Sequence, residues 1–275
     1  MSHQYFLGAD IGTTAIKAAL FDEQGRKVLH HAQEYTLLKP DAQRVEQIPH
    51  VYWETFQACV KKVVQDSKID PEQIKAFSMD SSAETIVFLD EKMEPLDNFY
   101  VWLDSRASIE AEEINHHFTA EEILHATGQT PIDPCYPAAK IAWFRKHKPE
   151  AFRKIRMMFM CDDYILWHMS GRKVSHGSSW CTSYFWNITT KEWWPDMLDY
   201  LGITAGGTAA RNRGVWHPGR KHPARGGRCA GAAQGPAAGD GRTGPVQRCH
   251  RCRQRDARRI QRVHWRGPDG MHHYG

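Results

Sequence analysis

The amino-acid composition changes abruptly near Gly206, and this break limits how much of the 275-residue chain can fold. From Gly206 onward the sequence contains no Leu, Phe, Ser or Glu and is rich in Gly, Ala, Pro and Arg. No apolar period of a strand or a helix persists there, and such a chain cannot bury enough apolar surface to offset its conformational entropy. We therefore expect a folded domain over residues 1–205 and a disordered tail over residues 206–275.

The charge divides at the same point. Of 36 Lys and Arg and 32 Asp and Glu residues, the tail holds 15 basic and 3 acidic ones, which leaves 21 and 29 for the first part. The first part is thus near −8 and the tail near +12. A basic arm of this kind would bind RNA or DNA weakly through phosphates, without base readout. We do not expect nucleic acid to be a functional partner.

The chain shows no targeting or membrane signal. Its start, "MSHQYFLGAD", lacks a basic region followed by an apolar one, and no apolar run approaches the roughly 18 residues of a membrane helix. The cysteines of the first part have no framework spacing, which favours reduced thiols. We expect a cytoplasmic protein with no membrane partner.

Apolar patterns in the first part predict an α/β fold. The runs end at turn signals and show the period of a strand or of a helix. The expected strands are residues 5–10, 15–22, 27–37, 74–80, 85–90 and 98–104, and the first three form a β-meander. The expected helices are residues 49–67, 108–118, 120–125, 138–147 and 162–169. Alternating helices and strands after the meander are typical of an α/β layer fold.

The segment "GADIGTTAIKAALFD" has the pattern of a ligand site. Asp10 ends a buried strand, Gly12 permits a close backbone approach, and Thr13 and Thr14 offer hydroxyl and N–H groups at the hairpin turn. Turn N–H groups can bind the anionic oxygens of a triphosphate, and a carboxylate can hold Mg²⁺ directly or through water. The alternative is an ordinary hairpin in which these residues only make the turn. We leave Lys17, on the following strand, out of the predicted site.

This segment resembles the first phosphate motif of actin-like kinases, and of the FGGY carbohydrate kinases in particular. The resemblance continues in family order through "FSMDSSAETIVFLDEKMEPL", "YVWLDSRA", "TGQTPIDPCYPAAKIAWFRKHKPEAF", "MCDDYILWHMSGRKVSHGSS" and "WWPDMLDYLGIT", which together cover nearly all of residues 5–204. The first part is similar to the N-terminal, sugar-binding domain of a xylulokinase-like enzyme. The resemblance implies an α/β, RNase H-like (actin-like) domain with a mixed sheet flanked by helices.

The resemblance also implies roles for individual residues. Asp10 matches the family's Mg²⁺–phosphate aspartate, which holds the metal through water, and the turn after it matches the phosphate turn. The implied cofactors are ATP and Mg²⁺. Five residues match positions on the substrate side: Ser82, Glu84, Asp104, Arg106 and Tyr136.

Alternatives stay open for these substrate-side residues. Glu84 could be an exposed residue at a strand edge, Asp104 and Arg106 a local ion pair that fixes a turn, and Tyr136 a packing residue. Glycerol kinases have an arginine at the position of Ala83, and many xylulokinases have Gln-Met-His over residues 82–84. This sequence therefore argues against glycerol and against D-xylulose itself.

The implied reaction is transfer of the γ-phosphoryl group of ATP to a hydroxyl of a pentulose or related sugar or polyol. Such an enzyme is a carbohydrate kinase, a phosphotransferase with an alcohol group as acceptor. The family's catalytic base and adenosine site belong to a second actin-like domain, which residues 206–275 do not resemble. We expect no catalytic residue in this chain and no activity from it alone, and homodimer formation is left open. The rival interpretation is a non-catalytic sugar-binding or regulatory fragment with a basic nucleic-acid-binding tail.

The stretch "RCHRCRQRDARR" in the tail does not predict a zinc site, because Cys249 and Cys252 have no second pair at a standard spacing. A shifted reading frame explains the tail better. Read with a constant one-base offset and allowed synonymous codons, "TGPVQRCHRCRQRDARRIQRVHWRG" can become a segment with the "LDQ" and "STG" of the family's continuation. We therefore hypothesise a frameshift near residues 205–208.

Overall fold

The computed structural model describes residues 3–175, 177–204 and 207–208. Every described residue lies within the unit Met1–Arg220. The predicted tail, residues 206–275, lies outside the described residues except for residues 207–208. Its predicted disorder and the frameshift hypothesis stay predictions. Within the described part of the chain, no helix combines the length and apolar character needed to cross a membrane.

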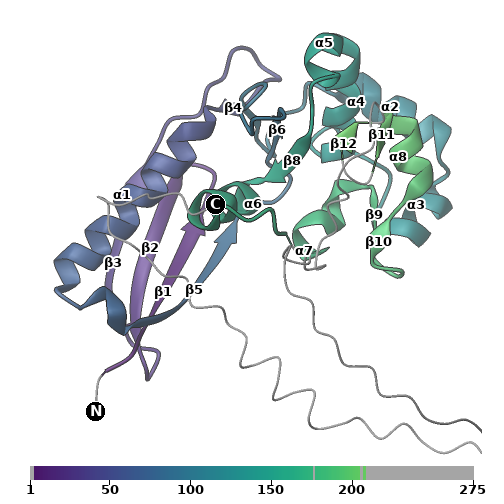
Figure 1. Ribbon diagram of the computed structural model, residues 1–275. Helices are drawn as coiled ribbons and strands as arrows, with labels where there is room; N and C mark the ends of the chain where they lie inside the picture. The colour runs from purple at the N-terminus through teal and green to yellow at the C-terminus, as the bar shows by residue number, and fades with distance from the viewer. Residues whose placement is uncertain (1–2, 176, 205–206, 209–275) are drawn as a thin grey trace, which may run out of the picture. The chain divides into compact units, whose positions relative to one another are not determined.

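Four strands form the first sheet, in the order β3-β2-β1-β5 (Figure 1). β1 (Tyr5–Ile11), β2 (Ala15–Asp22) and β3 (Lys27–Glu34) form the predicted antiparallel meander. β5 (Ile74–Ser81) pairs with β1 in parallel, so the chain must cross over between β3 and β5. That crossover contains the helix α1 (Pro49–Ser67), with the bounds that the periodicity predicts.

Side chains alternate across this sheet, so its two faces differ. Leu7, Ile11 and Ile16 are buried on the face that α1 covers (Figure 1). The apolar stripe of α1 packs there, and its fully or nearly fully buried side chains include Tyr52 and Val63. The residues that alternate with this buried set point to the opposite face of the sheet.

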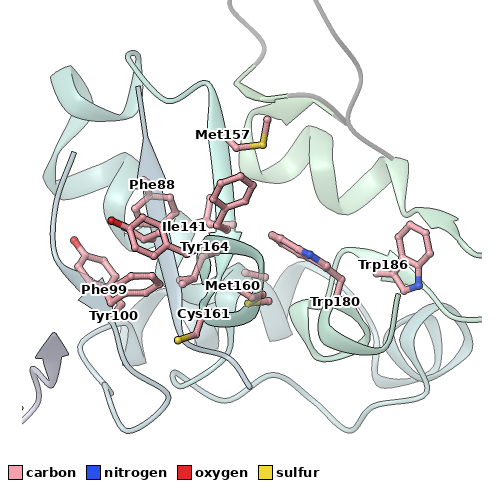
Figure 2. Close-up of a cluster of buried hydrophobic side chains, with 14 of the residues drawn as sticks. Phe88, Phe99, Tyr100, Ile141, Met157, Met160, Cys161, Tyr164, Trp180 and Trp186 are labelled. Carbon is pink, nitrogen blue, oxygen red and sulfur yellow. The ribbon is translucent and has the colours of Figure 1, made fainter. Parts of the chain in front are cut away.

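A second sheet has the order β4-β7-β6-β8 and is antiparallel. Its strands are β4 (Glu46–Gln47), β7 (Phe99–Tyr100), β6 (Ile86–Leu89) and β8 (Met157–Met160). All four β6 residues are buried. Figure 2 shows Phe88, Phe99 and Tyr100 in one apolar cluster with Tyr164, and rings of this cluster meet edge to face, as at 5.7 Å between the centroids of Phe88 and Tyr100.

Helices and short segments complete the described part. The longer helices are α2 (Ser108–His117), α3 (Ala120–Thr127), α4 (Pro137–His147), α6 (Cys161–Ser170) and α8 (Pro195–Leu201). The short helices are α5 (Pro149–Phe152), α7 (Gly177–Trp180), η1 (Pro71–Gln73) and η2 (Cys181–Ser183). The two-residue strands are β9 (Trp186–Asn187), β10 (Glu192–Trp193), β11 (Ile203–Thr204) and β12 (Gly207–Thr208).

The prediction of a strand over residues 98–104 is wrong beyond Tyr100, where β7 ends. The chain turns because the Asp104 N–H donates to the Val101 carbonyl oxygen at 2.9 Å. The Asp104 carboxylate also accepts from the Val45 N–H at 2.7 Å. This turn leaves Trp102 40% exposed and buries Asp104 completely.

Candidate phosphate and sugar site

The connection between β1 and β2 is a tight turn that requires glycine at residue 12. The Gly12 N–H donates to the Ala15 carbonyl oxygen at 3.0 Å, and a Cβ on residue 12 would lie 2.9 Å from that same oxygen. A side chain would therefore force the backbone to move. The Tyr35 hydroxyl donates to the Gly12 carbonyl oxygen and holds the turn from the β3 side. The predicted hairpin turn is confirmed.

Three charged residues form a row across the open face of the first sheet. Asp10 is the register partner of Lys17 on β2 and of Asp80 on β5, so the three side chains leave the sheet on the same face. Lys17 Nζ donates to Asp10 Oδ2 at 3.0 Å, and the two side chains are 61% and 47% exposed. The row lies beside the turn and is open to solvent.

Sequence reasoning missed two members of this row. It set Lys17 aside as a structural strand residue and did not consider Asp80. The available signal was register: Lys17 follows the turn at the position that faces Asp10, and Asp80 ends the strand that pairs with β1 in parallel.

This arrangement suits Mg²⁺ held largely by phosphate and water. Among the described residues, no three His, Cys, Asp or Glu side chains form a metal-binding group. Mg²⁺ commonly keeps several waters and takes only one or two protein carboxylates together with substrate phosphates. Asp10 and Asp80 are the carboxylates beside the turn that would hold it.

Trp102 joins the phosphate turn to the substrate-side residues. Its indole N–H donates to Thr13 Oγ1 at 2.8 Å, and its backbone N–H donates to Thr85 Oγ1 at 3.3 Å. Close by, the Ser82 N–H donates to the Ile11 carbonyl oxygen at 3.0 Å, which ties the end of β5 to the end of β1. The predicted Thr13 and Ser82 therefore lie in one region. Trp102 was missed as a site residue, because it falls within the strand expected over residues 98–104.

Glu84 lies between β5 and β6 in the left-handed conformation, with a φ of 56°. It is partly exposed, and Tyr136 is the N-cap residue of α4. Burial raises the pKa of Tyr136, and the nearby charges of Cys135 and Glu84 raise it further. The Tyr136 ring packs against Tyr184 at 4.6 Å between centroids. Glu84 and Tyr136 are thus close enough for the charge of one to act on the hydroxyl of the other.

Asp104 and Arg106 form a buried ion network instead of an open pair. Arg106 Nε donates to Asp104 Oδ1 at 2.8 Å. One terminal nitrogen of Arg106 donates both to Asp104 Oδ2 at 2.7 Å and to Glu46 Oε1 at 2.5 Å. The Arg106 guanidinium also lies 3.9 Å from the centroid of the Tyr100 ring. Asp104 and Arg106 are thus paired, as the alternative interpretation expects, and the pairing extends to Glu46. A contact between these residues and a sugar stays a prediction.

Burial shapes the ionisation of this network. Desolvation alone would lower the pKa of the Arg106 guanidinium, but the hydrogen bonds and charges of Asp104 and Glu46 raise it above its ordinary value. Arg106 is thus held charged at every physiological pH. The side chains of Asp104 and Arg106 are 0% and 3% exposed. Their charges are therefore buried and do not face solvent.

Comparison with known proteins places this geometry in a family. Residues 5–207 match the family model of the N-terminal domain of the FGGY family of carbohydrate kinases. The chain is 33% identical over 207 residues to a glycerol kinase of Limosilactobacillus reuteri, and 32% identical over 201 residues to a gluconokinase of Bacillus subtilis. Each alignment covers 73% of this chain, and 41% and 38% of those two relatives.

A solved structure agrees. The ligand-bound xylulose kinase of Lactobacillus acidophilus superposes with a TM-score of 0.69 at 27% identity, over 74% of this chain and 41% of that one. The chain thus spans about two fifths of the length of these relatives. The predicted actin-like α/β fold is confirmed, and the chain belongs to the FGGY family of carbohydrate kinases through its N-terminal domain.

Proposed function

We propose that the described domain supplies the sugar and γ-phosphate contacts of an ATP-dependent carbohydrate kinase. The acceptor is a hydroxyl of a pentulose or of a related sugar or polyol. One observation carries this proposal: the phosphate turn with its row of charged residues lies next to Ser82 and Trp102, joined by the hydrogen bond between Trp102 and Thr13. A phosphate and a hydroxyl acceptor bound there would be neighbours, as phosphoryl transfer requires.

On the phosphate side, each residue has a role that follows from its chemistry. Mg²⁺–ATP supplies the phosphoryl group when it is bound. Gly12 would shape the turn, the N–H groups of Thr13 and Thr14 would bind phosphate oxygens, and Asp10 would hold the metal through water. Lys17 adds a positive charge 3.0 Å from Asp10, where it can also approach a phosphate oxygen.

On the sugar side, Glu84 can accept hydrogen bonds from two hydroxyls, and Tyr136 provides an aromatic face beside it. Ser82 adds a hydroxyl at the end of β5. The relatives act by name on gluconate, glycerol and xylulose, so the family alone does not select the acceptor. Ala83 lacks the donor groups of an arginine, which supports an acceptor other than glycerol.

Calorimetric titration of the purified chain with D-xylulose, other pentuloses, gluconate and glycerol tests the sugar contacts. We expect one of these to bind and the variant Glu84→Gln to bind it about tenfold more weakly, because a charge-assisted hydrogen bond is lost. Glu54→Gln, an exposed glutamate on α1, is the matched control and should bind normally. Equal binding by the wild type and Glu84→Gln would refute the role of Glu84.

We further propose that catalysis needs groups outside the described residues, including an aspartate as base for the attacking hydroxyl. The chain is then expected to release no ADP in the presence of ATP, Mg²⁺ and any sugar of the panel. Sugar-dependent ADP release by the purified chain, abolished by Asp10→Asn, would contradict this part of the proposal.

A further inference from the structure

Lys140 on α4 is a lysine with no exposed surface. Its Nζ donates to two backbone carbonyl oxygens, those of Glu84 and Val101, each at 2.9 Å. Burying an ammonium or amine group is costly unless its hydrogen bonds are satisfied. The two hydrogen bonds satisfy the buried amino group of Lys140. Both acceptor residues lie in segments that carry predicted substrate residues.

The first acceptor belongs to a strained residue. A non-glycine residue with a positive φ is uncommon, because its Cβ is crowded against the backbone in the left-handed conformation. Glu84 has a φ of 56°, and Lys140 holds its carbonyl oxygen from the interior. The charge of Glu84 also helps to raise the pKa values of Tyr136 and Cys135, so its carboxylate acts on both residues.

The second acceptor belongs to the segment that ends β7. Val101 immediately precedes Trp102, whose indole binds Thr13 of the phosphate turn. The backbone N–H of Lys140 donates to the Tyr136 carbonyl oxygen at 3.3 Å in the first turn of α4. One residue thus connects the segments that carry Glu84, Trp102 and Tyr136.

We infer that Lys140 is the positioning residue of the sugar site, because its two hydrogen bonds fix the strained backbone of Glu84 and the peptide before Trp102. The role of Lys140 in sugar binding rests on the proposed function. Its link to the backbone of Glu84 and to the peptide before Trp102 rests on the two hydrogen bonds alone. Lys140 touches no ligand in this account. It acts through the carboxylate of Glu84 and the indole of Trp102, which it holds in one arrangement.

The ionisation of Lys140 agrees with a hydrogen-bonding role. Burial lowers the pKa of Lys140 to about 7, and the charge of Arg106 acts in the same direction, while Asp104, Cys135 and Glu84 oppose it. A neutral amine has two N–H groups, which match the two carbonyl oxygens, and an ammonium group has three. Both forms can therefore keep the two hydrogen bonds.

A double-mutant cycle tests the link between Lys140 and the backbone of Glu84. Glycine adopts a positive φ without the steric penalty, so Glu84→Gly removes the strain that Lys140 offsets. Glu84→Gln serves as the strained reference, because it lacks the charge that acts on Lys140, as Glu84→Gly does. We expect Lys140→Met to lower the urea midpoint of the 275-residue chain clearly less in the Glu84→Gln background than in the Glu84→Gly background, because loss of the lysine lets the strained backbone relax. A lysine that only fills the core would give equal shifts in the two backgrounds, and that result would overturn the inference. If Lys140→Met does not fold, Lys140→Gln takes its place in the same cycle.

Thiol labelling gives a second readout that does not require a ligand. Cys135 and Cys181 both sense the charge of Glu84, and burial raises the pKa of each thiol, that of Cys135 to about 12. In Lys140→Met we expect labelling at these cysteines, read by peptide mapping, to accelerate about tenfold as the local structure opens. Val63→Ala, a core change in α1, is the control and should leave these rates unchanged. Equal acceleration in the two variants would contradict a local role.

Sugar binding separates this inference from the proposed function. If the wild-type chain binds a sugar of the panel, Lys140→Met should weaken that binding about tenfold. Unchanged binding would overturn the inference. If no sugar binds to the wild type, the proposed substrate class fails, and the cycle and the labelling rates still decide whether Lys140 positions Glu84.

Discussion

Two groups of charged residues, the open row on the first sheet and the network around Arg106, differ in exposure. The open row, Lys17–Asp10–Asp80, lies on the uncovered face of the first sheet, and its Lys17–Asp10 pair is about half exposed. The buried network joins Arg106 to Asp104 and Glu46, with side chains at most 9% exposed. Exposed ion pairs contribute about 0–1 kcal/mol, whereas breaking a buried pair costs about 3–5 kcal/mol.

Hydrogen bonding within the protein decides which of these carboxylates can bind a ligand. Both oxygens of Asp104 already accept hydrogen bonds from Arg106, and Oδ2 accepts another from Val45. Little acceptor capacity remains for a sugar or a metal. Asp10 has a single protein donor among the hydrogen bonds that the described residues show, so it can turn toward Mg²⁺ or phosphate. The same residue type serves the scaffold in one place and is available to a ligand in the other.

The largest expected effect breaks the buried network. Arg106→Met leaves Asp104 and Glu46 without their main donor, and we expect it to lower the free energy of unfolding by about 3–5 kcal/mol. Urea denaturation followed by circular dichroism measures this loss. Arg26→Met, which removes an exposed arginine from a pair with Asp22, is the matched control and should change stability by less than about 0.5 kcal/mol. Equal losses would show that burial does not distinguish these pairs.

The second prediction concerns the turn of the open group. Gly12→Ala places a Cβ 2.9 Å from the Ala15 carbonyl oxygen, so the turn must shift. We expect a loss of about 1–3 kcal/mol in unfolding free energy, together with loss of Mg²⁺–tripolyphosphate binding in calorimetry. Gly8→Ala is the control on the same strand, because its Cβ would meet Phe21 at an ordinary 3.5 Å. Normal tripolyphosphate binding by Gly12→Ala would remove the turn from the phosphate site.

The third prediction uses a buried histidine that belongs to neither charged group. His168 stacks on Trp53 at 4.9 Å between ring centroids, and burial lowers its pKa to about 4. A base with a lowered pKa stabilises the fold when neutral, and this contribution is lost as pH falls from about 6.5 toward about 4. We expect the loss to be about 1 kcal/mol, reduced by the partial exposure of the ring.

His168→Phe tests that pH dependence. The stability of the wild type should fall more steeply than that of His168→Phe between about pH 6.5 and pH 4, as measured by urea midpoints at each pH. Parallel curves for the two proteins would show that His168 does not couple folding to protonation. A Phe at this position keeps the stacking on Trp53, so the comparison isolates the titration.

The smallest expected effect on stability belongs to the open row. Asp10→Asn should change the unfolding free energy by less than about 0.5 kcal/mol, because its pair with Lys17 is solvated. Asp104→Asn, in contrast, should cost several kcal/mol, since it weakens a buried network. Thermal or urea unfolding of the two variants side by side measures the ratio. Equal costs would contradict the division between scaffold and ligand-facing charges.

Local sequence patterns predicted the elements that depend on local physics. The period of α1 and the alternation of β2 gave bounds that the structure reproduces, and the turn at Gly12 follows from residues within five positions of one another. The strand β8 and the short β4 were not predicted, because a run such as "MMFM" suits a helix as well as a strand.

The candidate site needed contacts between distant residues. Arg106 meets Glu46 across 60 positions, and Lys140 meets the Glu84 carbonyl oxygen across 56. No local pattern shows that a lysine in "PAAKIAWF" is fully buried, because helix periodicity treats it as a polar residue on a solvated face. The family resemblance supplied the positions of Glu84 and Asp104. The structure alone shows that the Asp104 side chain is buried and paired, while the side chain of Glu84 remains accessible.

Chemical-shift mapping on the ¹⁵N-labelled chain tests the central claim, that the open group and the sugar-side residues form one ligand site. The titrants are Mg²⁺–tripolyphosphate and the sugar panel. We predict that tripolyphosphate shifts the amides of Gly12, Thr13 and Thr14, and that a bound sugar shifts those around Glu84 and the indole N–H of Trp102. Shifts centred on a distant element such as α3, or no shifts with any titrant, would contradict the account.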